Sequence, residues 1–243
     1  MMTTILIVIL VLVLVSFLKL NVVKGWFGEK MTSAGMWALL DTDRYRRIDD
    51  LIVPARNGTT QIDHALVSVH GIFVIESKNI KGWIFGSPEN DKWIQSIYGK
   101  KRQFQNPIKQ NYRHVRCLAD YLGVDEKVFN SVVFFIGDCE FKTPMPSSVL
   151  NRGLIPYVKS FNTTYLTLQQ VADIEARLIA LKGDTSLTKQ VHLDSLRNRH
   201  ESTTVCPRCG ERLVQRVAKK GGSEGKPFWG CSSYPKCKFT RPA

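Results

Sequence analysis

The chain has 243 residues, which is enough for one ordinary domain with smaller attachments. Its hydrophobic content of 44% excludes a disordered chain, and its net charge of +13 favours polyanionic partners, either nucleic acid or anionic lipid. Four of the six cysteines lie near the C-terminus, whereas Cys117 and Cys139 stand alone in apolar surroundings. This distribution suits a reducing compartment better than a disulfide framework.

Residues 1–18 contain no charged side chain and are dominated by Ile, Val and Leu. At about 1.5 Å per residue they span roughly 27 Å, close to the apolar thickness of a bilayer. A cleaved signal peptide would need a basic residue before this run and a small-residue cleavage site after it, and the sequence has neither. Lys19, Lys24 and Lys30 follow the run, which favours a cytoplasmic location for the rest of the chain. We therefore expect a single-pass anchor at residues 1–23 in the inner (cytoplasmic) membrane, with soluble domains in the cytoplasm.

Beyond the anchor, the pattern predicts an α/β fold in which a mixed β-sheet is flanked by helices. Apolar or alternating runs indicate strands at residues 48–54, 60–69, 72–78, 131–136 and 154–158. Helical stripes, with caps at Asn106 and Thr167, indicate helices at residues 28–40, 106–122, 167–181 and 186–199. We divide the chain into the anchor (1–23), a central domain (24–160), a helical extension or linker (161–200) and a C-terminal cysteine-containing module (201–243).

Acidic and basic residues converge on the hairpin formed by the second and third predicted strands. Glu76 and Lys78 are two positions apart, so both side chains leave the same face of their strand. If Val69 pairs with Ile72, Asp63 lies opposite Lys78 and diagonal to Glu76. The Cβ atoms of the two acids are then separated by somewhat less than roughly 7–8 Å.

Two carboxylates at that distance predict a site for Mg²⁺, which prefers oxygen ligands. Asp63 and Glu76 would hold the ion, and Lys78 would neutralise negative charge that develops on a phosphate. Gln61 points to the same face, and Glu29 could supply a further carboxylate from the preceding helix. The alternative is a hairpin with a solvated charged face and an exposed ion pair of little energetic value.

Several motifs in this region resemble the NERD (nuclease-related) domain, a family assigned to the PD-(D/E)-x-K nuclease superfamily. The residues that carry the resemblance are Gly28-Glu29, residues 60–64, 71–79 and 81–86, Asn106-Pro107, Gln110-Asn111 and His114. The resemblance implies a restriction-endonuclease-like fold, a Mg²⁺ cofactor and catalytic roles for Asp63, Glu76, Lys78, Glu29 and Gln110. The chain departs from the superfamily pattern at Ile62, where proline would precede the aspartate.

A basic stretch with interleaved aromatic residues follows the hairpin. No acidic residue interrupts Lys100, Lys101, Arg102, Lys109, Arg113 and Arg116, and Phe104 and Tyr112 lie among them. We predict nucleic-acid contacts for Lys100, Lys101, Arg102 and Arg113. The alternative is a solvated helix face with Tyr112 in the core. His64 and His114 have no second ligand at suitable spacing, so we do not predict them as metal ligands.

The four C-terminal cysteines form two pairs, Cys206 with Cys209 and Cys231 with Cys237. Four thiolates close a tetrahedral shell, which predicts a structural zinc ion without a catalytic position. The alternative is four free or disulfide-bonded cysteines in a tail.

This segment resembles the C4 zinc finger of bacterial type I topoisomerases, through residues 206–210, Leu213, Gly225, residues 228–235 and Cys237. The resemblance implies binding of DNA, largely single strands, without strand passage, since no topoisomerase catalytic domain is present. Nine basic and two acidic side chains give the ribbon a charge of 9 − 2 = +7. Phe228, Trp229 and Tyr234 offer faces on which bases can stack.

The sequence therefore predicts a membrane-anchored, Mg²⁺-dependent DNA nuclease whose zinc ribbon delivers DNA. A second hypothesis keeps the same architecture as a DNA tether with an inactive acidic site. A third makes the ribbon a protein-interaction module near the membrane. The acids and lysine at the hairpin favour the first over the second, and the charge and aromatic residues of the ribbon favour DNA over the third.

Overall fold

The computed structural model describes residues 37–243, apart from residues 56, 57 and 203. The chain divides into two compact units, residues 1–41 and 42–243, and the elements below belong to the second. The predicted anchor at residues 1–23, most of the predicted helix at 28–40, and Glu29 lie outside the described residues. Within the part of the chain that is described, no helix is both long and apolar enough to cross a bilayer.

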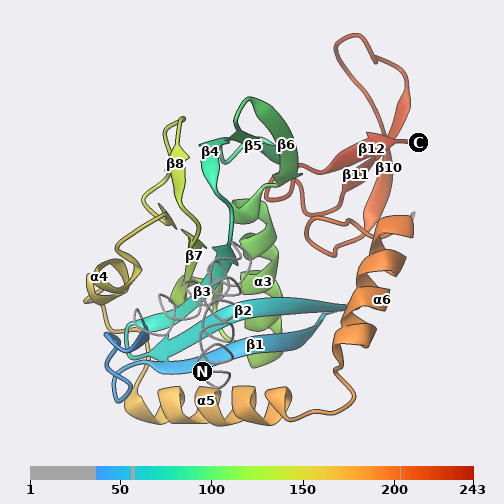
Figure 1. Ribbon diagram of the computed structural model, residues 1–243. Helices are drawn as coiled ribbons and strands as arrows, with labels where there is room; N and C mark the ends of the chain where they lie inside the picture. Colours follow the sequence, from blue (N-terminus) through green and yellow to red (C-terminus); the bar gives the residue numbers. More distant parts are fainter. Residues whose placement is uncertain (1–36, 56–57, 203) are drawn as a thin grey trace, which may run out of the picture. The chain divides into compact units, whose positions relative to one another are not determined.

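The main sheet is mixed, as the sequence predicts, and its spatial order is β1-β2-β3-β7-β9 (Figure 1). Its strands are β1 (Arg46–Ala55), β2 (Gly58–Ser68), β3 (Gly71–Lys78), β7 (Phe129–Phe135) and β9 (Val149–Leu150). The first three strands are antiparallel neighbours, whereas β3 pairs with β7, and β7 with β9, in parallel. The central position of β3 explains why its residues 71–76 are all buried.

The register between β2 and β3 differs from the predicted one by two residues. Val67, not Val69, pairs with Ile72, because the chain turns between Ser68 and Gly71. Gly71 has φ +110°, and a Cβ there would lie 2.4 Å from the carbonyl oxygen of Val128, so this tight turn requires glycine. The shift is even, so the alternation of side chains between the two faces is retained.

The sequence analysis missed a second sheet, whose spatial order is β6-β5-β4-β8. Its strands are β4 (Gly82–Phe85), β5 (Lys92–Ile97), β6 (Lys100–Gln105) and β8 (Cys139–Phe141). Aromatic rings form its core: Trp93 stacks on Phe135 with 6.2 Å between centroids, and Phe104 and Phe141 meet Phe135 edge-on. Phe104 therefore has a packing role here.

Four helices and a short 3₁₀ turn, η1 (Glu126–Val128), accompany the sheets in the described region. The helices are α3 (Pro107–Leu122), α4 (Leu154–Lys159), α5 (Leu168–Lys182) and α6 (Lys189–Glu201). The predicted caps at Asn106 and Thr167 are confirmed: the Asn106 side chain caps α3, and Thr167 forms a capping box with Gln170 at α5. Gly123 ends α3 in the left-handed conformation.

The predicted strand at residues 154–158 is wrong, because this segment forms α4. Short apolar runs do not distinguish a strand from a buried helical turn. Leu154, Ile155 and Val158 are buried at helical spacing, and Pro156 lies in the first turn, where its missing N–H costs no hydrogen bond.

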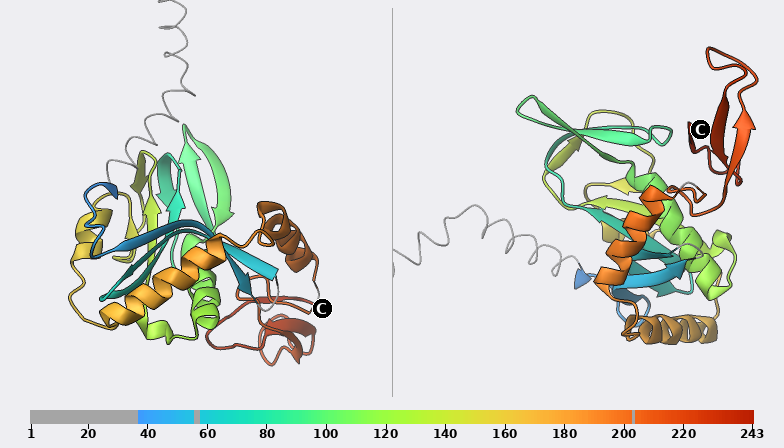
Figure 2. Two further views of the ribbon diagram at one scale, coloured as in Figure 1. Left: turned by 90° about the horizontal axis from the view of Figure 1, so that it is seen from below. Right: turned by 90° about the vertical axis from the view of Figure 1, so that its right-hand side faces the viewer.

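The helices cover the main sheet and build its core. Helix α3 contacts β1, β2, β3 and β7, α5 packs on β1 and β2, and α6 packs on β2 (Figures 1 and 2). Leu118 of α3 and Leu178 of α5 join Ile62 and Val74 in one fully buried cluster. This packing fixes the side of α3 that faces the ends of β2 and β3.

The C-terminal module is a three-stranded antiparallel sheet, β10 (Leu213–Val217), β11 (Pro227–Cys231) and β12 (Thr240–Pro242). Its core consists of the four cysteines and Leu213, with Trp229 and Phe239 packed against them. So small an apolar core gives little stability by itself. The fold of this module therefore depends on its four cysteines.

Candidate functional site

Glu76 is a charged side chain buried in the protein, at only 3% exposure near the end of β3. Both carboxylate oxygens are engaged: Nζ of Lys78 lies 2.5 Å from Oε1, and Nε2 of His114 lies 3.0 Å from Oε2. A buried carboxylate without such partners would be strongly destabilising. The two contacts explain how β3 can carry a charge into the interior.

The surroundings of Glu76 favour its ionised form. Burial by itself raises the pKa of this carboxyl group, but the hydrogen bond and charge of His114 act against it, as does the charge of Lys78. The net result is a pKa below the ordinary value of 4.5. Glu76 is therefore a carboxylate at neutral pH, which is the form that binds cations.

Lys78 connects Glu76 to the first turns of helix α3. Its ammonium Nζ also donates to Oε1 of Gln110, over 3.0 Å. Asn111 anchors this end of the helix, because its Nδ2 donates to the carbonyl oxygens of Val74 and Val132 on the two central strands. Glu76, Lys78 and Gln110, all singled out in the sequence, thus form one hydrogen-bonded group.

Asp63 lies at the point where the ladder between β2 and β3 ends. The last pair of the ladder is His64 with Ile75, and one further step of that register places Asp63 across from Glu76. Oδ2 of Asp63 accepts hydrogen bonds from the backbone N–H and the hydroxyl of Ser77, both over 2.8 Å. Asp63 thus replaces a ladder partner for Ser77, and its Oδ1 has no hydrogen bond among the described residues.

The other residue predicted from β2, Gln61, is not part of this hydrogen-bonded group. Gln61 is half-buried and pairs with Ile52 of β1. Within the described part of the chain, no hydrogen bond joins it to Glu76 or Lys78.

His114 belongs to this site, although the sequence analysis named it only as a motif residue and gave it no site role. Its Nδ1 lies 2.6 Å from the hydroxyl of Thr60, and its Nε2 faces Glu76, so the ring bridges β2 and β3. Gln110 and His114 are four residues apart on α3 and share one helical face. That spacing was the only local indication that His114 lies beside Gln110. The contact of His114 with Glu76 joins residues 38 positions apart, so a local pattern could not predict it.

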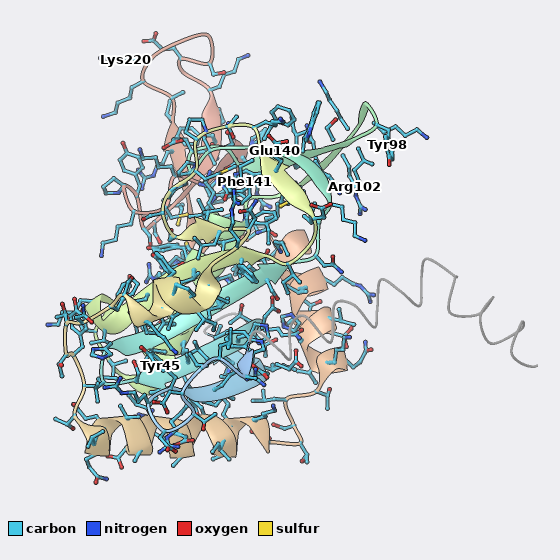
Figure 3. The ribbon with its side chains drawn as sticks, turned by 60° about the vertical axis from the view of Figure 1, so that its left-hand side comes forward. Tyr45, Tyr98, Arg102, Glu140, Phe141 and Lys220 are labelled. Carbon is cyan, nitrogen blue, oxygen red and sulfur yellow. The ribbon has the colours of Figure 1, made fainter. Side chains whose placement is uncertain are left out.

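The basic residues fall into two different environments. Lys100, Lys101 and Arg102 are exposed on β6, beside the fully exposed Tyr98 at the hairpin tip (Figure 3). Arg113, in contrast, is buried on α3 at 4% exposure, so it does not lie on that open surface. Tyr112 is half-buried on the same helix.

The four C-terminal cysteines converge as a metal site requires. Their sulfur atoms all lie within 4.8 Å of one another, with 3.8 Å between Cys206 and Cys237 and 3.3 Å between Cys209 and Cys231. A tetrahedral zinc ion with Zn–S bonds of about 2.3 Å would separate its sulfurs by about 3.8 Å, so the residues fit zinc. All four cysteines are buried, and the donor set supports a closed structural site.

The aromatic residues of the ribbon differ in availability. Trp229 packs against the cysteine core, and Phe228 is half-exposed beside it on β11. Tyr234 is 60% exposed, and the guanidinium carbon of Arg216 lies 5.8 Å from its ring centroid. Tyr234 is therefore the most exposed of these three rings.

Comparisons with known proteins match these two parts of the chain. Residues 24–136 match the nuclease-related domain, and residues 203–243 match the topoisomerase DNA binding C4 zinc finger. An uncharacterized protein of Bacillus anthracis is 43% identical over 182 residues, which cover 72% of this chain and 85% of that protein.

Two further relatives match only the ribbon. DNA topoisomerase 1 of Methanocaldococcus jannaschii is 43% identical over 42 residues, 17% of this chain and 5% of that enzyme. The uncharacterized protein YrdD of Escherichia coli is 51% identical over 37 residues, 15% of this chain and 18% of that protein. No solved structure matches the chain. The chain belongs to the nuclease-related domain family and ends in a topoisomerase-type C4 zinc ribbon.

Proposed function

We propose that this protein is a Mg²⁺-dependent DNA nuclease, anchored in the cytoplasmic membrane, whose zinc ribbon holds the DNA. The observation that carries the proposal is the buried, ionised Glu76, joined to Lys78 and Gln110 and placed next to the end of the ladder at Asp63. A structural role alone gives little reason to keep a carboxylate in the interior. The two family matches, which suggest DNA binding and nuclease activity, agree with it.

The donor chemistry at this position fits Mg²⁺. Glu76 and Oδ1 of Asp63 supply hard oxygen ligands, and the low pKa keeps Glu76 charged. Bound there, the ion would supply a Lewis acid and an activated water. Lys78 would share the charge of Glu76 and present its ammonium to a scissile phosphate, while Gln110 orients that ammonium.

Two basic surfaces support DNA as the substrate. The exposed cations of β6 provide phosphate contacts beside the aromatic tip of the hairpin. The ribbon, with a charge of +7 and the exposed Tyr234, provides a second surface that suits single strands. We also propose a restriction-endonuclease-like fold for the central domain. The order of the main sheet and the packing of α3 against it support this fold.

An inactive DNA tether is the competing function. It is favoured by the fact that both oxygens of Glu76 are already engaged, one by Lys78 and the other by His114. A cation must share these contacts or replace them.

The test is cleavage of single- and double-stranded DNA by the full chain, purified in a mild detergent, with Mg²⁺ present or chelated. Asp63→Asn and Glu76→Gln keep the shapes of the side chains and should abolish Mg²⁺-dependent cleavage. Glu140→Gln is the matched control, because Glu140 is an exposed acid that forms an ion pair with Lys142 on a different sheet from the site. Cleavage that survives Glu76→Gln rejects the site, and DNA binding without cleavage establishes the tether.

The anchor is tested separately by removing residues 1–23. We expect the full chain in the membrane pellet of lysed cells and the shortened chain in the supernatant. A full chain found in the supernatant would reject the anchor and leave the nuclease proposal intact.

A further inference from the structure

Arg113 is a buried cation that forms no side-chain hydrogen bond with any described residue. It lies on α3 at 4% exposure, and none of its three guanidinium nitrogens has a hydrogen-bond partner in the described part of the protein. Buried arginines normally form several hydrogen bonds, because removal of the charge from water is costly. This guanidinium therefore points to a ligand that supplies several acceptor atoms.

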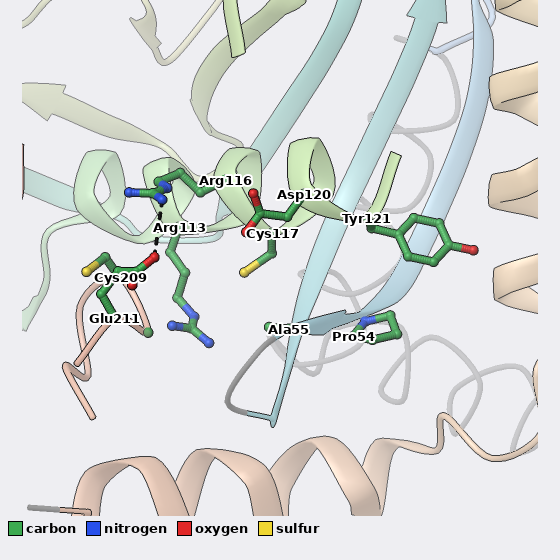
Figure 4. A pocket seen from close by; sticks show the side chains of 10 residues that line it. Pro54, Ala55, Arg113, Arg116, Cys117, Asp120, Tyr121, Cys209 and Glu211 are labelled. Atoms are coloured by element: carbon green, nitrogen blue, oxygen red, sulfur yellow. Dashed lines mark hydrogen bonds and ion pairs between the residues drawn. The ribbon is translucent and has the colours of Figure 1, made fainter. Parts of the chain in front are cut away.

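Arg113 lines a pocket of about 420 Å³, drawn in Figure 4. Helix α3 forms one wall with Arg113, Arg116, Cys117 and Asp120, which recur at helical spacing. Tyr121, the end of β1 at Pro54 and Ala55, and the zinc knuckle at Cys209 to Glu211 also line the pocket. The volume accommodates a phosphate group with several waters, at roughly 30 Å³ for each water.

The knuckle allows the arginine to approach because it carries no side chain at residue 210. A Cβ on Gly210 would lie 2.7 Å from Nη1 of Arg113, so a side chain there would displace the flexible end of the arginine. Gly210 also has φ +80°, so the turn between the cysteine pair and β10 requires glycine. The close approach keeps the guanidinium at the boundary between α3 and the ribbon.

The charges around the pocket leave a positive potential at Arg113. Arg116 lies 3.4 Å from the carboxylate of Glu211 (Figure 4) and 3.6 Å from that of Glu126, so its charge is compensated. Asp120 is exposed and stands seven residues from Arg113 along the helix, about 10 Å, where water screens it. Among the described residues, Arg113 thus has no acid paired with it in this partly enclosed space.

We infer that this pocket binds a phosphate group. The planar guanidinium presents several donors in a fixed geometry that matches the oxygens of phosphate, and the low-dielectric surroundings strengthen the attraction. The phosphate comes from a nucleic-acid strand that passes between α3 and the ribbon, or it is free phosphate. In either case the ligand joins the zinc knuckle to the helix that carries Gln110 and His114. The inference is independent of cleavage, because binding alone is measured.

Thermal unfolding of the full, zinc-loaded chain in phosphate or chloride at equal ionic strength tests the inference. Saturating phosphate should raise the melting temperature of the wild type by roughly 5 °C. Arg113→Met should melt at or above the wild type in chloride and show no rise in phosphate. Arg152→Met, which removes an exposed arginine, should respond as the wild type does.

Arg113→Lys covers the case in which the methionine variant fails to fold. It keeps the charge but loses the planar group, so its response to phosphate should fall by more than half. An unchanged response in either Arg113 variant, or no response in the wild type, overturns the inference. Oligonucleotides with and without a 5′-phosphate, added in place of phosphate, identify the source: stabilisation that depends on Arg113 assigns it to the strand, and its absence assigns it to free phosphate.

Discussion

Nε2 of His114 lies 3.0 Å from Oε2 of Glu76, and the same imidazole meets the hydroxyl of Thr60 through Nδ1. A side chain from helix α3 therefore links two strands at the point where β2 leaves β3. Both contacts are buried, so the ring is fixed in orientation and Glu76 is fixed with it. Precise placement of a carboxylate in this way is what a metal-dependent reaction needs.

Replacement of His114 by leucine should change the pH dependence of stability. The folded protein holds the pKa of Glu76 below 4.5, so Glu76 contributes stability that is present above the unfolded pKa and lost as the pH falls through the folded pKa. Without His114, only Lys78 acts against the effect of burial on the pKa of Glu76, so this contribution shrinks. We expect a loss of about 2 kcal/mol at pH 7 and a smaller further loss between about pH 5 and 3 than in the wild type. Urea unfolding across this pH range measures both effects.

His70→Leu is the matched control for that experiment, because the ring of His70 contacts the carbonyl oxygen of Thr163 and not a carboxylate. If both variants give the same change of the pH profile, the effect does not belong to Glu76. If His114→Leu unfolds at the urea concentration of the wild type, the contact has no structural importance.

The sequence predicted the local elements of this fold better than its long-range arrangement. Asn106, Gly123 and the Thr167–Gln170 capping box mark helix ends through interactions within a few residues, so a local pattern was sufficient. The second sheet was missed because its strands are short and partly polar, and their core depends on Trp93 stacking on Phe135 from a different sheet.

In the candidate site, too, the sequence predicted the local grouping of residues but not their long-range contacts. Glu76, Lys78 and Asp63 lie on two adjoining strands, so strand alternation was sufficient to group them. His114 and the burial of Arg113 depend on how α3 packs on the sheet and on where the ribbon lies, which no local pattern encodes. The basic stretch therefore could not be divided into exposed and buried members from sequence.

Zinc should be required for the ribbon to fold. The full chain should contain one zinc ion, and Cys231→Ser should reduce this to a small fraction because the tetrahedral shell loses a thiolate. Since structural zinc contributes on the order of 10 kcal/mol to such small modules, we expect the ribbon to unfold and its affinity for DNA to drop. Elemental analysis and proteolysis between residues 205 and 243 measure the two consequences.

Cys139→Ser serves as the control for the zinc experiment. Cys139 is a half-buried free thiol outside the cluster, and burial raises its pKa to about 11, so it is a weak metal ligand. Zinc content that persists in Cys231→Ser, or falls equally in Cys139→Ser, would contradict a four-cysteine site.

Neutralisation of the β6 cations should weaken DNA binding in a salt-dependent way. We expect the triple change of Lys100, Lys101 and Arg102 to glutamine to reduce the slope of log K against log salt by about 0.9 for each duplex phosphate that the variant no longer neutralises. The matched control neutralises three exposed lysines elsewhere, Lys127, Lys182 and Lys189. Equal slopes for the two triple variants would mean that net charge, and not the hairpin, governs binding.

Tyr234→Ala should weaken the binding of single-stranded DNA without a change in the salt slope. The ring is 60% exposed, with Arg216 against it, so a base can stack on it, and loss of one stacked base costs about 1–3 kcal/mol. Affinity for a short single strand should fall by roughly tenfold, while affinity for a blunt duplex should change little, because paired bases are not free to stack. Tyr165→Ala, which removes another exposed ring outside the ribbon, is the control. Equal losses for single and double strands would assign Tyr234 to the stability of the ribbon, which retention of zinc in the variant would check directly.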